Sequence, residues 1–377
     1  MPWRISPTPT VVIGESGGVE YALARVGKVS RFSEGYIVST GLPIGIRVYD
    51  KEGRFQRWLG REGEGPGEFR AVSGTWVTEG DTVVAYDSFL RRITYFDPRG
   101  DLLQTVPFHA GGSFVAGEER PRIIVGRFSD GSFLSLQRIY PPFPTTSDPE
   151  LTTSSKRYFR EVPGSIRRDT ITQVADWDVA YEIEPGFPIG TWVAVPFSPT
   201  ASEVVDDTVL YVAEGRRFEL DAWSFRGEFM ARFRKDHEVV PITDEVWAGE
   251  LERREENFLA RMESTGNRQG LNVQNELAAM RRTFREKKRL PNLPVHGRRM
   301  KADSDGNVWI EAWPDDLNRP SSTWHLFLAE SERFVGTVEM PPRFRPVTIY
   351  SDVVVGIHTD ELDVQSVRVY PVSYTHL

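Results

Sequence analysis

The chain alternates between short apolar runs and small polar turns. Six runs rich in β-branched and aromatic residues each follow an acidic or glycine-containing turn: YIVST, DTVVAYD, SFLSLQ, TVLYVAE, NVWIEAW and VVVGIHT. Such runs are typical of β-strands opened by tight turns. The acidic turn positions are residues 34, 79, 130, 206, 305 and 352, separated by 45, 51, 76, 99 and 47 residues. Three gaps match one repeat of roughly 40–50 residues, and two hold a repeat plus an insert.

The second half of the repeat carries another turn. In residues 46–60 and 93–106, an apolar strand, an Asp-x-x-Gly turn and a second apolar strand follow one another. Asp and Gly suit such hairpins because both tolerate left-handed backbone. Residues 220–233 keep only the Gly, and residues 327–338 have lost both. Four strands per repeat predict an all-β fold: a six-bladed β-propeller of four-stranded antiparallel blades over residues 10–370, with N-terminal residues completing the last blade.

Residues 241–291 change the period of the pattern. Apolar residues recur there at helical spacing in two groups, Trp247, Leu251, Phe258 and Met262, and then Val273, Leu277, Met280 and Phe284. This spacing predicts two amphipathic helices inserted after the fourth blade and lying on one rim. The shorter insert, residues 140–156, is rich in Pro, Thr and Ser and predicts a loop.

The stretch GREGEGPGEF at residues 60–69, followed by GDTVVAYDSFLRRITYFDPRG, resembles an NHL-type repeat. The layout is similar to the NHL-repeat-like and TolB-like six-bladed β-propeller proteins of bacteria. The resemblance implies an extracytoplasmic setting, periplasmic or secreted, and it leaves function open because this fold hosts binding modules, lyases and lactonases alike. The last residues, 371–377, resemble translated sequencing-adapter sequence, and we expect them to be a non-native tail outside the fold.

Strand parity predicts where the long connections lie. In an antiparallel blade, the connections from the second to the third strand, and from the fourth strand to the next blade, emerge on one face. All the long connections are of these two kinds, so we expect them on one face, called the loop rim. Long loops commonly carry function. The candidate ligand-binding residues on the loop rim are Arg61, Arg70, Asp87, Arg92, Trp313, Arg319 and Trp324.

Each candidate also has a structural explanation. The glycines of residues 60–69 supply backbone freedom between two blades, and the three glutamates among them disfavour a phosphate cradle. For Asp87 and Arg92 we favour a local hydrogen bond and an inter-blade contact. Exposed Trp and Arg are common binding anchors, whereas packing of Trp313 and Trp324 against the neighbouring blade is an equal alternative.

Composition narrows the classes of partner. The 377 residues carry a net charge of −8 with a pI near 5.5, which disfavours nucleic acid. There is no cysteine, so disulfides and thiolate chemistry are excluded. No apolar run approaches the ~18 residues of a membrane span. The N-terminus has no apolar signal core, so either the protein is cytosolic or the export signal lies outside this chain. We expect a monomer.

The candidate chemistry is sparse. Six histidines are scattered without H-x-H or H-E-x-x-H spacing, and no G-x-S-x-G elbow occurs. We therefore predict no cofactor and a non-catalytic binding or scaffolding role, with a protein, peptide or glycan on the loop rim. The alternative is a metal-dependent lyase or lactonase with its site at the channel mouth, where carboxylates could bind Ca or another divalent metal. A purely structural extracytoplasmic domain is the third possibility.

Overall fold

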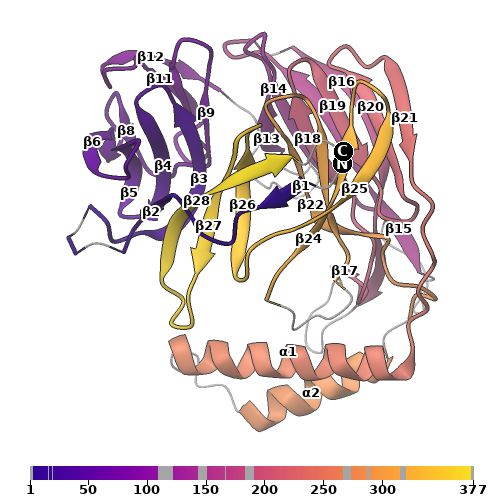
Figure 1. Cartoon of the computed structure of the whole chain (residues 1–377). Coiled ribbons are helices and arrows are strands. Elements are labelled where there is room, and N and C mark those ends of the chain that lie inside the picture. The colour runs from indigo at the N-terminus through magenta and orange to yellow at the C-terminus, as the bar shows by residue number, and fades with distance from the viewer. Residues whose placement is uncertain are drawn as a thin grey trace.

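A computed structural model describes residues 3–15, 17–18, 20–108, 122–142, 151–165, 167–182, 191–265, 273–286, 289–314 and 320–374. Six antiparallel sheets stand around a common axis (Figure 1). The first blade holds β3 (Ala24–Phe32), β4 (Gly35–Leu42), β5 (Ile44–Asp50) and β6 (Phe55–Leu59). The second holds β9 (Gly74–Val77), β10 (Val83–Asp87), β11 (Arg92–Phe96) and β12 (Leu102–Pro107). Between these blades, β7 (Arg61–Glu62) and β8 (Glu68–Phe69) form a short parallel pair.

The third blade contains β13 (Ile123–Arg127), β14 (Phe133–Ile139), β15 (Thr152–Glu161), β16 (Arg168–Glu182) and β17 (Thr191–Ala194). The fourth contains β18 (Ser202–Asp206), β19 (Val209–Ala213), β20 (Glu219–Ser224) and β21 (Phe229–Arg234). The fifth contains β22 (His296–Ala302), β23 (Val308–Ala312), β24 (Thr323–Leu328) and β25 (Arg333–Glu339). The fifth strand of the third blade is not among the sequence predictions; β16 continues for 15 residues and pairs with β17 beyond the predicted blade edge.

The sixth blade joins both ends of the chain. It consists of β26 (Phe344–Ile349), β27 (Val353–Thr359) and β28 (Gln365–Tyr374), with β1 (Trp3–Ile5) and β2 (Val11–Ile13) both paired to β28. N-terminal strands therefore complete the last blade, as the sequence predicts. Residues 371–374 lie inside β28, where Pro371 pairs with Val353 of β27 and residues 372–374 pair with β1. The expectation that the tail is outside the fold is therefore wrong for these four; residues 375–377 are outside the described residues.

The first strands of the blades form the inner ring. Each contacts the first strand of the next blade, in the order β3, β9, β13, β18, β22, β26, and the ring closes between β26 and β3. Six apolar clusters fill the spaces between successive blades; for example, Phe32 and Ile37 of the first blade pack with Val83 and Phe96 of the second. This arrangement follows from the alternating pattern, because both faces of every blade are covered by neighbours.

The two predicted helices are present. α1 (Asp244–Thr265) and α2 (Val273–Glu286) follow β21 and lie along one rim of the propeller (Figure 1). Thr243 accepts a hydrogen bond from the N–H of Val246 at 3.2 Å, which caps α1. Trp247 and Phe284 join the helices at 4.6 Å between ring centroids, and Phe197 of the propeller packs against Trp247.

Candidate functional site

The glycine-rich segment between β6 and β9 is a closed loop. The Glu68 carboxylate lies inside it and accepts hydrogen bonds from Nε of Arg61 at 2.7 Å and from the N–H of Gly65 at 2.8 Å. The Gly65 contact first, and then Arg61, lower the pKa of Glu68. Gly60 has a φ of +70°, and a side chain there would overlap the carbonyl oxygen of Gly67. Only glycine fits that position.

Asp87 holds the end of this loop. Its carboxylate is fully buried and accepts four backbone hydrogen bonds, from Arg70 at 2.7 Å, Ala71 at 3.1 Å, and Phe89 and Leu90 at 2.8 Å each. Both oxygens are thus occupied by the chain itself. Asp87 makes the local hydrogen bonds that the sequence favours, and it is not available to a ligand.

Arg92 holds the middle of the loop from the second blade. Its guanidinium donates to the carbonyl oxygens of Glu64 at 2.9 Å, Gly65 at 2.6 Å and Glu68 at 2.7 Å. The partner is backbone rather than an acidic side chain of another blade. Because one planar cation fixes three carbonyls, the loop is rigid where it reaches the loop rim.

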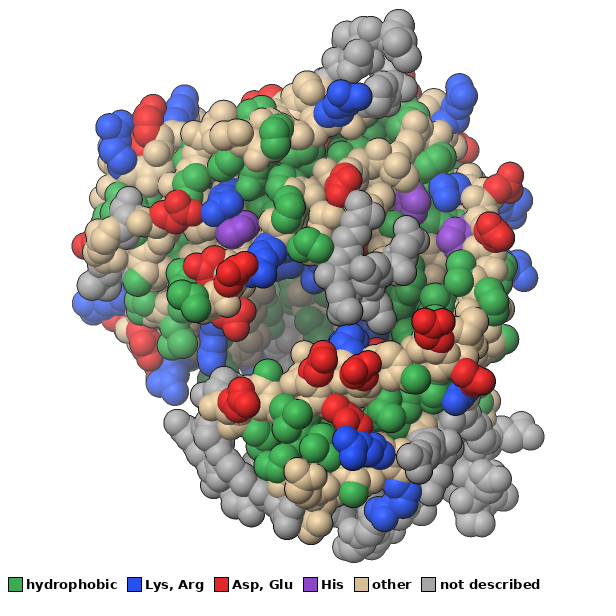
Figure 2. All heavy atoms as spheres, turned by 60° about the horizontal axis from the view of Figure 1, so that its bottom comes forward, with side chains coloured by type: hydrophobic (Ala, Val, Ile, Leu, Met, Phe, Trp, Pro, Cys, Tyr) green, Lys and Arg blue, Asp and Glu red, His purple; other side chains and the backbone are tan. Residues whose placement is uncertain are grey.

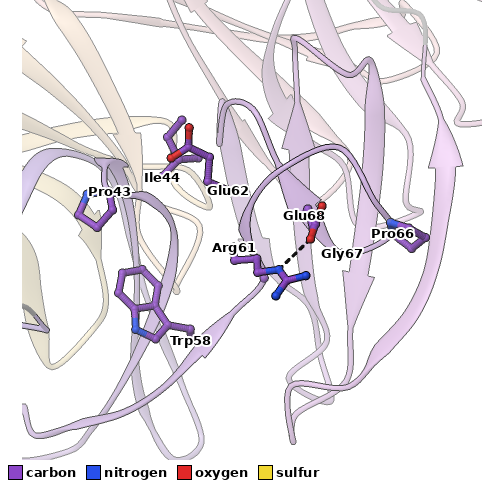
Figure 3. A pocket seen from close by; sticks show the side chains of 9 residues that line it. Pro43, Ile44, Trp58, Arg61, Glu62, Pro66, Gly67 and Glu68 are labelled. Carbon is purple, nitrogen blue, oxygen red and sulfur yellow. Dashed lines mark hydrogen bonds and ion pairs between the residues drawn. The ribbon is translucent and has the colours of Figure 1, made fainter.

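A pocket of about 650 Å³ lies between this loop and the first blade (Figure 3). Trp58 and Pro43 line one side, and Pro66 lines the other. The Trp58 side chain is 37% exposed. The guanidinium of Arg47, which is fully buried, lies 4.5 Å from the indole ring centroid. This cation–π contact helps to fix the orientation of the indole at the pocket wall.

Of the predicted residues that the structure describes, Arg61 lines this pocket and Arg70 does not. Arg61 lines it and is 82% exposed, although its Nε is engaged by Glu68. Arg70 is half-exposed; its guanidinium lies 3.7 Å from a carboxylate oxygen of Glu64 and 5.9 Å from the centroid of the exposed Phe89 ring. Phe89 and Trp58 were not predicted as site residues, because exposure of a single aromatic residue leaves no signal in the sequence.

The predicted tryptophan anchors do not meet in an exposed loop. Trp324 is fully buried within β24 among the residues between the fifth and sixth blades, and its Nε1 donates to Oγ of Ser322 at 3.0 Å. The expectation that Trp324 is a rim anchor is therefore wrong. β24 begins at Thr323, so Trp324 belongs to a strand and packs between two blades, which is the alternative that the sequence leaves open. Trp313 is partly buried and packs against Phe197 beneath the helices. Arg319 lies outside the described residues.

Three histidines that are distant in sequence surround one phenylalanine. The ring centroid of Phe218 lies 4.8 Å from that of His325, 5.8 Å from that of His296 and 5.9 Å from that of His237. Burial lowers the pKa of both His296 and His325 to about 4, so both rings are neutral near pH 7. The sequence cannot indicate this cluster, because it forms only where the fourth and fifth blades pack.

Within the part of the chain that the structure describes, no group of three His, Cys, Asp or Glu side chains is placed to hold a metal ion. Neither α1 nor α2 is long and apolar enough to cross a bilayer.

Comparisons with known proteins agree with this architecture. Residues 20–118 match the family model DUF5128, described as a 6-bladed beta-propeller. A member of the DUF4221 family from Bacteroides vulgatus has 8% identity and a TM-score of 0.51, with 99% of each chain covered. A Bacteroides fragilis protein described as exported has 11% identity and a TM-score of 0.47, covering 99% of this chain and 96% of that one.

Virginiamycin B lyase from Staphylococcus aureus has 8% identity and a TM-score of 0.43, covering 99% of this chain and all of the lyase chain. No curated protein matches the chain in sequence. The chain is a six-bladed β-propeller, and the likeness to the DUF4221 structure, at 8% identity, carries the fold alone.

Proposed function

We propose that the chain is a non-catalytic binding propeller that takes a peptide segment of a protein partner on its loop rim, with an apolar side chain seated against Trp58. The observation that carries the proposal is the pocket of about 650 Å³, which has Trp58, Pro43 and Ile44 of the first blade on one side and the loop held by Arg92 on the other. Pockets of a few hundred cubic ångströms lined by apolar residues are typical ligand sites, and tryptophan is the most frequent binding hot spot.

A peptide fits this rim better than a glycan. Leu42, 50% exposed, and Phe89, 72% exposed, are further apolar contacts on connections of the same rim, at the first and second blades. A glycan needs several free polar groups that converge on its hydroxyls, whereas Arg61 is engaged by Glu68. An extracytoplasmic location is part of this proposal and rests on the family resemblance of the sequence.

Selection from a displayed library of random peptides, alongside an array of glycans, tests the proposal. We expect enriched peptides to contain a large apolar residue. Trp58→Ala should weaken their binding by about thirtyfold or more, since truncating a hot-spot residue costs at least ~2 kcal/mol.

Met230→Ala is the matched control, because Met230 is an exposed apolar residue, 56% accessible, on the outer strand of the fourth blade. It should bind the selected peptides as wild type does. Peptides that bind Trp58→Ala with unchanged affinity would overturn the assignment of the pocket. Selective binding of glycans alone would replace the peptide with a sugar.

A further inference from the structure

Three cationic side chains lie on neighbouring strands of the inner ring. Lys301 is on β22, Arg345 on β26 and Lys28 on β3, and these strands follow one another around the channel. Pairing of each strand with the next strand of its blade is interrupted by a register shift, between His296 and Met300 in β22, for example. We call Lys28, Lys301 and Arg345 the channel cations. Figure 2 shows the loop rim hollowed at its centre, with charged side chains at the edge of the hollow.

The channel cations have no counter-ion in the part of the chain that the structure describes. Among the described residues, neither ammonium group nor the Arg345 guanidinium has a hydrogen bond or an ion pair, although all three side chains are partly buried. The acid whose charge acts on Lys301 is Glu311, and Glu311 is already engaged by Arg299, at 2.9 Å between Nη1 and Oε1. The local excess of positive charge is therefore not balanced by any side chain in the described ranges.

Their electrostatics agree with this geometry. Burial, and then the positive charges of Lys28, Arg345 and Arg299, hold the pKa of Lys301 at about 7, against an ordinary value of 10.5. Burial and the charge of Arg345 likewise lower the pKa of Lys28. Lysine ammonium groups shift this far only when they are desolvated without a partner.

An unbalanced cationic cluster inside a chain of net charge −8 needs an explanation. Burying a charge is unfavourable unless it is paired and hydrogen-bonded. For structure alone, apolar residues on the three strands would serve better. Two ammonium groups and a guanidinium on adjacent strands are the groups that recognise oxyanions, Arg through paired N–H donors and Lys as a point charge.

We propose that the channel cations form a binding site for a compact oxyanion of two or more negative charges, a phosphate or a polycarboxylate, inside the propeller channel. The bound anion supplies the missing counter-charge for three blades at once. The site is separate from the Trp58 pocket, so it stands whether or not the loop rim binds a peptide.

Thermal unfolding at constant ionic strength tests this site with inorganic phosphate, citrate and acetate, each against sodium chloride. We expect a saturable rise of several degrees with phosphate or citrate, because binding to the native state alone stabilises it. The comparison of phosphate with citrate decides between the two oxyanion chemistries. An equal response in all salts, or no response to any anion, would overturn the proposal.

Replacing either lysine should have two opposite effects on thermal stability. Without anion, Lys301→Gln and Lys28→Gln should each unfold at a higher temperature than wild type. With phosphate or citrate added, neither variant should show the further rise that is expected of wild type. Lys51→Gln is the control, since Lys51 is exposed on the turn between β5 and β6, and it should respond as wild type does. If Lys301→Gln kept the full response, the site would be wrongly placed.

Isothermal titration calorimetry of the wild-type protein with the anion tests the site without any variant, so the result does not depend on whether a variant folds. Near pH 8 much of Lys301 is neutral, so binding of an anion must draw a proton from the buffer. The measured heat should then change with the ionisation enthalpy of the buffer at pH 8, and much less at pH 6. Anion binding without proton uptake at pH 8 would contradict a contact with Lys301.

Discussion

The buried charges of the third and fourth blades differ from those of the inner ring. In the third blade, Asp176 is fully buried and accepts from Nε of Arg138 at 2.7 Å. Lys156 lies 3.0 Å from a carboxylate oxygen of Glu203 on the fourth blade. On the opposite side of the ring, Lys301 and its neighbours have no counter-ion among the described residues.

The difference separates structural charges from charges kept for another purpose. A paired buried ion contributes little net stability, but it is costly to uncover. An unpaired one lowers stability from the outset, and a fold has no reason to retain it unless something else binds there.

Asp176→Ala should be strongly destabilising. It leaves the partly buried Arg138 without its acid, and Oγ1 of Thr200 and the N–H of Ala201 without their acceptor. We expect the free energy of unfolding to fall by about 3–5 kcal/mol, measured by urea denaturation. The free energy of unfolding of Asp176→Asn, which keeps an acceptor oxygen, should lie between the values for wild type and Asp176→Ala. A decrease in the free energy of unfolding below about 1 kcal/mol would mean that the paired buried charges are no more important for stability than the channel cations.

Acidification should destabilise the junction of the fourth and fifth blades. His296 and His325 have pKa values near 4 when folded and 6.5 when unfolded. Their neutral form thus stabilises the fold fully above pH 6.5, and this stability is lost as the pH falls towards 4. At pH 5 we expect a loss of roughly 2 kcal/mol for each ring.

Urea midpoints at pH 7.5 and pH 5 measure this loss. In His325→Gln the pH dependence should shrink by about half, because one of the two rings no longer titrates. If the free energy of unfolding were the same at pH 7.5 and pH 5, the two histidine rings would have to be solvated in the folded protein.

Lys301→Gln should be stabilising, which is unusual for a partly buried residue. The folded pKa of about 7 lies below the unfolded 10.5, so the wild-type protein loses stability as the pH is lowered from 10.5 towards 7. Removing the amine should raise the free energy of unfolding at pH 7 by roughly 1–2 kcal/mol, since channel water screens part of the effect. Denaturation without added anion measures the gain, and a loss would indicate an unseen partner.

Arg54→Ala should have the smallest effect. Arg54 pairs with Asp50 at 2.9 Å, but its side chain is 69% exposed on a tight turn. Exposed pairs of this kind contribute little, so the melting temperature should not shift measurably. A clear drop in melting temperature would show that exposed ion pairs also stabilise this propeller. It would weaken the distinction between paired buried charges and the channel cations.

The prediction of the fold succeeded where the signal was local and repeated. The turns at 34, 79, 130, 206, 305 and 352 all open second strands, and both helices formed from their apolar spacing. The strand β17 was not predicted, because it extends only the third blade and no repeat in the sequence indicates it. Trp324 was assigned to a loop although it lies in β24, because a sequence pattern places the first residue of a strand only to within one or two positions.

Periodicity and strand parity within about fifty residues are enough to predict the blades, their number, the helices and the face on which the long connections emerge. Which charges are paired depends instead on how the blades pack into a closed ring. Lys28 and Lys301 are 273 positions apart, and their charges interact only because the ring of blades closes. Desolvation and the sum of neighbouring charges depend on distances through space, and no pattern along the chain records them.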